Sequence, residues 1–340
     1  MLVVRPISMS DYDSLHECAV ESGHGFTSLP VNEELLRKRI QHSEYSFGKE
    51  DVSAATDESY LMVGVDSETG HVVGTTGIEA AVGFDTPFYS YHISTHVHSS
   101  RRLGVKKQVK ILTLGNDYTG ATELCTLFLL PDYRKGLNGR LLSKCRFLML
   151  AEHQERFDST VIAEMRGVSD QNGNSPFWQW LKEHFFSIDF TLADYLTGIG
   201  NKGFIADLMP KYPIYINLLS EEAQAVIGKV HENTKPALRL LEQEGFSCRD
   251  HVDIFDGGPT VECQLAQIRS VRRSIKAKVV IDDRDYQQSV IISNCEFSEF
   301  RATATNVDYR AQDGEVYMHS DVAKALLLEN GSMARFIINE

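Results

Sequence analysis

The sequence predicts an α/β protein with a mixed, mostly antiparallel sheet flanked by helices, and a small β-rich module at the C-terminal end. Three observations predict this fold. A strand near the middle of the chain leads directly into a basic, glycine-containing turn and a helix. Earlier segments alternate between hairpin-like runs and capped helices. After residue 264, short strand-like runs predominate, with one helix predicted at Asp321 to Leu328.

The central strand–turn–helix unit organises the rest of the chain. Residues 123–130 form a mostly apolar run, too short for a helix, that is bounded by Pro131 and Asp132. The turn after it contains Arg134, Lys135, Gly136, Asn138 and Gly139. Such a unit directs backbone N–H groups and the positive end of a helix dipole at one point, which suits a pyrophosphate. A plain strand–helix junction explains the same pattern, so the turn alone leaves both interpretations open.

The N-terminal segment predicts a strand and two helices. Residues 2–7 form the strand, and Ser10 and Asp11 are suited to begin the first helix. Glycines and hydroxyl residues at 22–30 form a loop that either links the helices or contacts substrate through hydroxyl and N–H groups. Asn32 is expected to cap the second helix.

A hairpin and several histidines come next. The β-rich runs 60–65 and 72–82 flank a glycine-containing turn and predict the hairpin. Three histidines follow at a spacing that could offer metal ligands, namely His92, His96 and His98. No acidic or cysteine partner lies at a matching interval, so we expect strand histidines and no metal site. Residues 109–114 predict one more strand before the central one.

The second half of the chain completes the predicted sheet. Residues 161–165 and 185–190 predict strands, and Ser175 with Pro176 predicts a helix start. An insertion of short helical stretches is expected at about 191–230. The other predicted elements are a helix at 236–245 with a glycine cap, strands at 252–255 and 260–264, and a basic helix at about 265–276.

Length and charge limit the classes of protein. A chain of 340 residues can form one large or two modest domains, and we place a boundary that gives a main domain of residues 1–264 and a module of residues 265–340. The net charge of −13 argues against nucleic-acid binding. No long apolar run and no signal-peptide pattern occur, so a cytoplasmic protein without membrane contact is expected.

The cysteines indicate neither a disulfide framework nor a zinc site. They are scattered without a C-x-x-C pair, at Cys18, Cys125, Cys145, Cys248, Cys263 and Cys295. Cys125 lies on the central strand, where a nucleophile is one interpretation. Its apolar neighbours favour a thiol of the core.

The order of elements resembles the GNAT superfamily of acyl-CoA N-acyltransferases, whose loop usually reads Arg/Gln-x-x-Gly-x-Gly/Ala. Arg134 and Gly139 match the ends of that pattern. Leu137 occupies its first glycine position, and the glycine comes one residue earlier, at Gly136. The resemblance implies an α/β acyltransferase fold with the C-terminal module added.

Six blocks in the same order make the chain similar to the arginine N-succinyltransferase family, nearly end to end. One departure is His24, in a loop that is richer in glycine in the family. The blocks are Thr27–Pro30, Asn116–Gly120, Glu123–Leu129, Ala163–Val168, Ser175–Gln179 and Asp253–Thr260.

This resemblance implies transfer of a succinyl group from succinyl-CoA to the α-amine of L-arginine, the first step of arginine catabolism to glutamate and succinate. Succinyl-CoA is then a substrate, and no permanently bound cofactor is expected. The family assigns a proton-donor role to a histidine that matches His231, and a succinyl-CoA contact to Leu127. The loop from Arg134 to Arg140, with Gly136, Asn138 and Gly139, would hold the pyrophosphate. Glu123 is a rival candidate, as base for the amine.

Several points stay open at the level of sequence. Candidates for the substrate guanidinium are Glu164, Asp189, Asp253 and Asp256. The alternatives are a related N-acyltransferase that acts on another amine, such as ornithine, and one subunit of a two-chain succinyltransferase. Homo- and hetero-oligomers are both compatible with the sequence.

Overall fold

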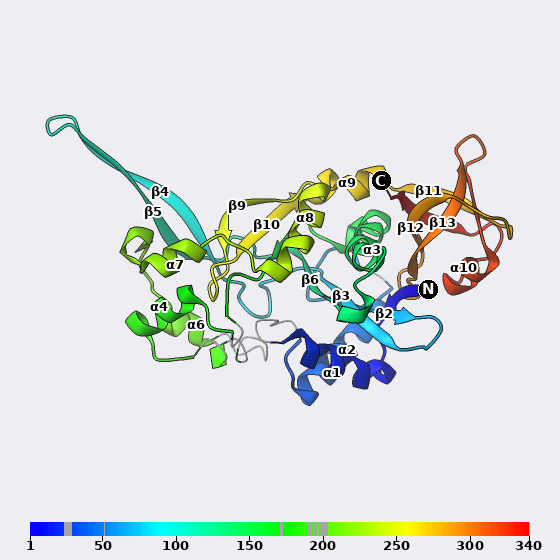
Figure 1. Ribbon diagram of the computed structural model, residues 1–340, viewed down its shortest axis with the longest axis horizontal. Helices are drawn as coiled ribbons and strands as arrows, with labels where there is room; N and C mark the ends of the chain where they lie inside the picture. The colour runs from blue at the N-terminus through cyan, green and yellow to red at the C-terminus, as the bar shows by residue number, and fades with distance from the viewer. Residues whose placement is uncertain are drawn as a thin grey trace.

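The computed structural model describes residues 1–23, 29–50, 52–170, 173–189, 192–193, 196 and 203–339 (Figure 1). Its strands are β1 (Leu2–Pro6), β2 (Ser59–Asp66), β3 (Val72–Glu79), β4 (Ser90–Ser100), β5 (Val105–Gly115), β6 (Thr122–Leu129), β7 (Thr160–Glu164), β8 (Ile214–Tyr215), β9 (Ser247–Val252), β10 (Pro259–Gln264), β11 (Ile275–Ile281), β12 (Gln288–Asn294), β13 (Ala302–Arg310), β14 (Glu315–Met318) and β15 (Met333–Ile338). Its α-helices are α1 (Tyr12–Ser22), α2 (Glu33–Gly48), α3 (Asn138–Glu152), α4 (Pro176–Phe185), α6 (Gly203–Leu208), α7 (Glu221–Val226), α8 (Lys235–Glu244), α9 (Arg269–Arg273) and α10 (Ser320–Ala325).

The strands form one continuous mixed sheet in the order β12-β15-β11-β14-β13-β1-β2-β3-β6-β7-β10-β9-β4-β5-β8. In the part of the chain that the structure describes, two of the pairings are parallel, β6 with β7 and β11 with β14. The other pairings are antiparallel, which confirms the predicted α/β fold with a mixed, mostly antiparallel sheet.

Helices cover both faces of the central strands. α3 packs its buried Leu148 and Met149 into a core that also contains Val161 of β7. On the opposite face, Leu15 of α1 and Leu36 of α2 belong to a second core. Full burial of one such side chain contributes about 1.5–3 kcal/mol to the free energy of unfolding. The two cores therefore hold β6 and β7 rigidly between layers.

The C-terminal strands close on themselves. β12 pairs with both β15 and β13, so that β11 to β15 form a ring around their own core. This confirms a β-rich C-terminal region, although the sequence did not predict its closure. β1 joins the ring to the rest of the sheet through β13. The proposed boundary between residues 264 and 265 stays a prediction.

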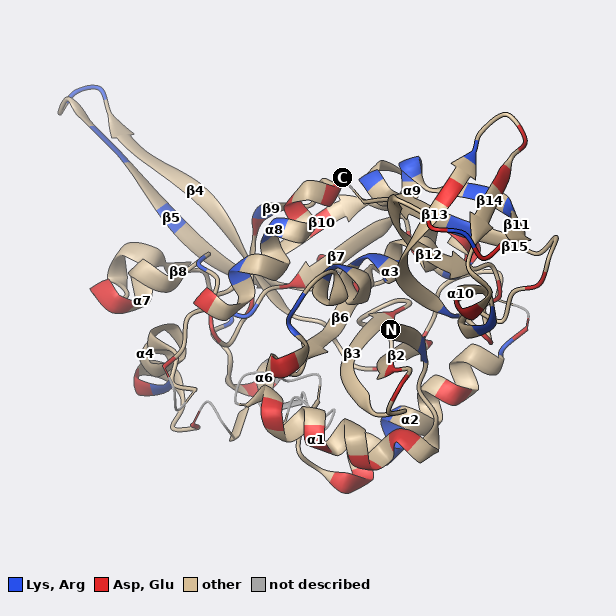
Figure 2. Cartoon of the chain, turned by 45° about the vertical axis from the view of Figure 1, so that its right-hand side comes forward, with Lys and Arg blue, Asp and Glu red and all other residues tan. Residues whose placement is uncertain are grey.

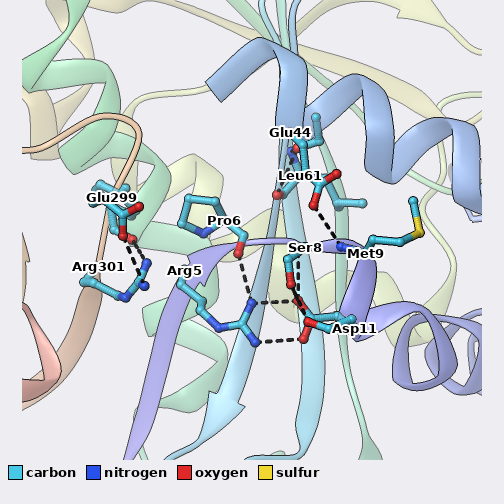
Figure 3. A network of polar contacts seen from close by, with 12 residues as sticks. Arg5, Pro6, Ser8, Met9, Asp11, Glu44, Leu61, Glu299 and Arg301 are labelled. Atoms are coloured by element: carbon cyan, nitrogen blue, oxygen red, sulfur yellow. Dashed lines mark hydrogen bonds and ion pairs between the residues drawn. The ribbon is translucent and has the colours of Figure 1, made fainter. Parts of the chain in front are cut away.

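A polar network joins β1 to the first helix (Figure 3). Arg5 donates to both carboxylate oxygens of Asp11, at 2.6 and 2.7 Å, and Ser8 N–H donates to Asp11 at 2.9 Å. Burial alone would raise the pKa of Asp11, but these hydrogen bonds and the Arg5 charge lower it. Met9 N–H donates to Glu44 of α2 at 2.9 Å, which fixes the entry to α1.

Three predicted elements were wrong. The strand expected from 185 does not form at 186–189, where Trp178 Nε1 donates to the Ile188 carbonyl at 3.0 Å and ties the segment to α4. The strand expected at 252–255 ends at Val252, because the next residues form a turn around the carboxylate of Asp253. The basic helix is reduced to α9, since β11 begins at Ile275.

Candidate active site

The two central strands separate from each other. β6 and β7 pair only at Thr122 with Val161 and at Glu123 with Ile162. Beyond these pairs, β6 remains paired with β3 and β7 with β10. In the described chain, the edges of β6 and β7 that face each other therefore have no partner strand past this point. An extended molecule that contains amides can pair with such an edge as an added strand does.

Leu127 lies on the open edge of β6. Leu127 and Arg166 follow the paired Thr122 and Val161 by five residues each, so both lie past the point at which β6 and β7 separate. A bulge interrupts the β3–β6 pairing at this level, and Thr126 has a left-handed φ of 54°. Arg39 of α2 donates from Nη2 to the hydroxyl oxygen of Thr126 at 2.9 Å. This contact helps to hold the main chain at Leu127.

The turn between β6 and α3 explains the shifted glycine. Gly136 has a φ of 54°, a conformation that favours glycine. Leu137, the N-cap residue of α3, has a φ of −99°, a conformation that any residue can adopt. A Cβ at Gly136 or Gly139 would meet no atom within 4 Å, so the backbone is approachable there. The departure from the family pattern therefore follows from the local backbone.

Two side chains fix this turn. Arg134 donates from Nε to the Leu129 carbonyl at 2.9 Å, and Asn138 donates from Nδ2 to the Tyr133 carbonyl at 3.0 Å. Arg134 is exposed, and the first N–H groups of α3 lack partners within the helix. Together they form a positive helix N-terminus with the chemistry of an anion site.

His231 is fastened to the end of β7. It precedes the short turn Glu232–Thr234, and its N–H donates to the Arg166 carbonyl at 2.9 Å. Its Nδ1 accepts the N–H of Asn233 at 3.2 Å, so the neutral ring carries its proton on Nε2. Burial lowers the pKa of His231, and the charge of Arg166 lowers it further, against a smaller opposite effect of Glu232. The neutral imidazole therefore predominates at pH 7.

Two buried carboxyl groups support this strand end. Asp256 accepts the N–H groups of Gly167 and Gly258 at 2.6 and 2.8 Å. Asp253 accepts the N–H of Asp256 at 2.8 Å, and the two side chains hydrogen-bond each other. Burial raises the pKa of both groups, and the charge of Asp253 raises that of Asp256 further. A pair that shares a proton and binds backbone N–H groups is poorly suited to hold a guanidinium.

A second pair of carboxylates lies across β3 and β6. Glu79 and Glu123 are direct partners in the antiparallel pairing, so their side chains share one face of the sheet. Arg39 Nη2 lies 3.1 Å from a Glu79 oxygen, and the Ser59 hydroxyl donates to the same oxygen at 3.0 Å. Arg39 and Ser59 therefore hold Glu79 in place, on the face of the sheet that Glu123 shares.

Sequence reasoning missed Glu79 and Arg39. Glu79 ends a predicted strand and Arg39 lies on a predicted helix, but only the strand register and the packing of α2 bring them together. Cys125 lies beside them, and its pKa is raised by burial and by the charge of Glu79, as expected of a protonated thiol.

The remaining candidates are dispersed. Glu164 is half-buried on β7 and pairs in register with Thr260. Asp189 is exposed and forms an ion pair with Lys182 of α4, so it is tied to that helix. The loop residues 24–28 lie outside the described residues. His92 lies against the ring of His251, with centroids 4.8 Å apart.

Within the described ranges, no cluster of three or more His, Cys, Asp or Glu side chains is placed to hold a metal ion. None of the helices in these ranges has the length and apolar character needed to cross a membrane.

Comparison with known proteins identifies the chain. Residues 2–270 match the family model "Arginine N-succinyltransferase beta subunit", and residues 272–337 match its C-terminal domain. An arginine N-succinyltransferase of Yersinia enterocolitica is 46% identical over 99% of this chain and 97% of its own length. One from Citrobacter koseri is also 46% identical, over 91% of this chain and 90% of its own.

A solved structure agrees with these matches. That of arginine/ornithine succinyltransferase subunit AI from Pseudomonas aeruginosa has a TM-score of 0.91 and 35% identity, and the match covers 99% of this chain and 98% of that one. The fold, the site and these relatives define the chain as an acyltransferase. It belongs to the arginine N-succinyltransferase family.

Proposed function

We propose that this enzyme transfers the succinyl group of succinyl-CoA to the α-amine of L-arginine, giving N2-succinyl-L-arginine and CoA. The observation that carries the proposal is the hydrogen bond from His231 N–H to the Arg166 carbonyl, which holds this histidine just past the end of β7, where β6 and β7 have separated. In this geometry, a thioester bound along the open strand edge lies beside a histidine ring. The reaction is the first step of arginine catabolism to glutamate and succinate.

The acyl donor fits the open edge and the turn together, as in a GNAT-like acyltransferase. The amides of pantetheine pair with the main chain at Leu127, as an added strand would. The pyrophosphate then lies at the N-terminus of α3, near Arg134, Gly136 and Gly139. Asn138 contributes by fixing the turn. Succinyl-CoA is consumed in the reaction, so no resident cofactor is required.

His231 acts on the leaving group. The amine nitrogen bonds to the thioester carbon, a tetrahedral oxyanion forms, and the C–S bond then breaks to release the CoA sulfur. The Nε2–H of His231 is the donor that stabilises the negative charge on that sulfur, and the thiolate then takes a proton from water. The contact between Asn233 N–H and Nδ1 supports this orientation, because it occupies the other ring nitrogen.

The acceptor amine must lose a proton before it attacks. Glu123 is the base that we propose, and Glu79 shares its face of the sheet. Two carboxylates on one face of the sheet suit a cationic acceptor such as arginine. A carboxylate base of this kind contributes about 10²- to 10⁴-fold to the rate.

Two specific alternatives have support from one relative. The relative from Pseudomonas aeruginosa is subunit AI of an arginine/ornithine succinyltransferase. Ornithine is therefore a second candidate acceptor, and a second chain is a candidate partner. The cytoplasmic location and the boundary between residues 264 and 265 also remain predictions.

The direct test is release of free thiol by the purified chain with succinyl-CoA, with and without L-arginine. We expect release that depends on arginine, with mass spectrometry showing succinyl on the α-nitrogen. Faster release with ornithine would reassign the acceptor. Faster release with acetyl-CoA would reassign the donor. No release with any of these pairs would contradict the activity of the single chain.

A further inference from the structure

The hairpin of β4 and β5 extends beyond the sheet as a two-stranded ribbon (Figure 1). β4 pairs with β9 only at Tyr91 and His92, and β5 pairs with β8 only at Ile111 and Leu112. Residues 93–110, here called the arm, have no further strand partner in the described chain. A two-stranded hairpin alone is marginally stable in water, and its open edges invite pairing. The arm therefore has the properties of a segment that another surface covers.

The arm presents apolar and basic side chains to solvent. Val97, Leu103 and Val105 are 52%, 67% and 54% exposed. The arm holds five cations and no acid, namely Arg101, Arg102, Lys106, Lys107 and Lys110. The net charge of the chain is −13 with these five cations included, hence −18 without them. The arm is thus strongly complementary to the rest of its own chain.

One face of the arm combines these features. Lys106 and Lys110 lie on the same side of β5, and Val97 of β4 pairs between them with Gln108. All four residues are exposed. On the other side, the rings of His96 and His98 lie 6.5 and 6.4 Å from Tyr215, so the base of that face is partly covered.

A matching surface lies at the base of the arm. Residues 212–222, here called the base segment, include β8, the end strand of the sheet. Tyr212 and Leu218 are 86% and 68% exposed, among the most exposed large apolar residues of the described chain. Glu221 and Glu222 are also exposed, and the segment has no cation. Figure 2 shows acidic residues on α7 and basic residues along β5 and its turn.

The base segment cannot be covered by the tip of its own arm, because the arm leads away from it (Figures 1 and 2). A second copy related by a twofold axis can cover the base segment. If two copies place their arms side by side in opposite directions, each tip reaches the base segment of the other copy. Such an isologous contact needs one surface that is self-complementary. The arm and the base segment together form such a surface.

We infer that the chain associates with a second copy of itself, with the arm of each subunit docked on the base segment of the other. Apolar side chains of the arm meet Tyr212 and Leu218, and Lys106 and Lys110 meet Glu221 and Glu222. The inference is independent of the acyl acceptor, because none of these residues belongs to the proposed active site.

The test uses two charge-reversal variants, K106E/K110E and E221K/E222K, with light scattering after size-exclusion chromatography. The unmodified chain should have about twice the 38.2 kDa of one subunit. Each variant alone should dissociate at a protein concentration at least about tenfold higher, because like charges then meet at both contacts. An equimolar mixture of the two variants should restore the dimer, since both contacts again join opposite charges. K278E/K324E reverses two exposed cations of the C-terminal region and should leave the mass unchanged.

An arm-shortened variant separates association from folding. Residues 97–108 are replaced by Asn-Gly, which closes a two-residue hairpin between the paired His96 and Val109. It should be a folded monomer by circular dichroism and light scattering. A monomeric unmodified chain, a dimer that survives arm shortening, or a variant mixture that stays monomeric would each overturn the inference.

Discussion

The N–H of His231 donates to the carbonyl oxygen of Arg166 at 2.9 Å. This single bond joins the loop before α8 to the end of β7, and the neighbouring Gly167 and Val230 form an isolated bridge. The histidine therefore takes its position from a strand end. The orientation of its ring therefore depends on how firmly the backbone at the end of β7 is held. The first two predictions concern this ring.

Replacement of His231 by alanine removes the Nε2–H donor. We expect the thiol-release kcat with succinyl-CoA and arginine to fall at least about a hundredfold, since a positioned acid or base contributes about 10²- to 10⁴-fold. His231→Gln should retain part of the rate, because its amide N–H lies near the position of Nε2. His71→Ala, an exposed histidine that contacts Glu17, is the control and should be unchanged. Equal rates for the alanine variant and the unmodified enzyme would exclude the role.

The pH dependence of the rate follows from the lowered pKa of His231. Protonation of His231 adds a proton at Nδ1 and breaks the contact with Asn233 N–H that orients the ring, so the acidic limb due to His231 should lie below the ordinary histidine pKa of about 6.5. Above that limb, the protonation of the substrate amine governs the rate. The measurement is kcat/KM from pH 5 to 9. An acidic limb above the ordinary histidine value that disappears in His231→Gln would contradict the neutral-donor role.

The buried pair Asp253 and Asp256 predicts effects of different size for two similar substitutions. Asp256 accepts N–H groups with both of its oxygens, so Asp256→Asn places an N–H donor against one of them. We expect it to lower the free energy of unfolding by about 1–3 kcal/mol. Asp253→Asn retains one acceptor oxygen and can donate to Asp256, so it should be much less destabilising. Urea unfolding at pH 7 compares them.

The same pair has a defined pH dependence. Both folded-state pKa values are raised above the unfolded value, so the folded protein binds the shared proton more tightly. The stabilisation from this proton is fully present below the unfolded pKa and is lost as the pH rises through the raised values. Asp253→Asn should reduce this loss, because the charge of Asp253 is gone while the burial of Asp256 remains. If the free energy of unfolding of Asp253→Asn changes with pH as steeply as that of the unsubstituted protein, the two carboxyl groups do not share a proton.

Much of the site could be predicted because it depends on short segments. The strand, turn and helix around Gly136 follow from local sequence, as does the glycine cap at Gly245, whose φ is 104°. The role of His231 was predicted from the resemblance of long sequence blocks to the family. Arg39 and Glu79 could not be predicted, since they meet through the β3–β6 register and the packing of α2.

The closure of the C-terminal strands into a ring could not be predicted from local sequence either. The ring of β11 to β15 depends on the pairing of β12 with two strands, and short strand-like runs do not encode which partner each takes. The tight contact at Gly258 is another case, because a Cβ there would lie 2.1 Å from the Met165 carbonyl oxygen. The glycine is visible in the sequence, but the close approach of the backbone after β7 that requires it is visible only in the fold.

Two glycines of the turn before α3 should respond differently to alanine. Gly136 has a φ of 54°, so Gly136→Ala places a Cβ in a conformation that costs about 1–2 kcal/mol. Gly139 does not have a positive φ, and a Cβ there meets open space, so Gly139→Ala should not strain the backbone. Both add a methyl group beside the proposed pyrophosphate position, so both should raise KM for succinyl-CoA. Thermal unfolding and initial rates separate the two effects, and equal stability of the two variants would contradict the backbone argument.

Glu123 and Glu79 are direct partners across β6 and β3, yet they should serve different purposes. Glu79 is bound to Arg39 and Ser59, so Glu79→Gln should mainly raise KM for arginine by removing negative charge from the site. Glu123→Gln should lower kcat about a hundredfold at pH 7, because the amine then lacks its base. At a pH above the amine pKa this defect should shrink, since the amine is already deprotonated. A defect in Glu123→Gln that is the same at every pH would assign Glu123 to binding and leave deprotonation to solvent.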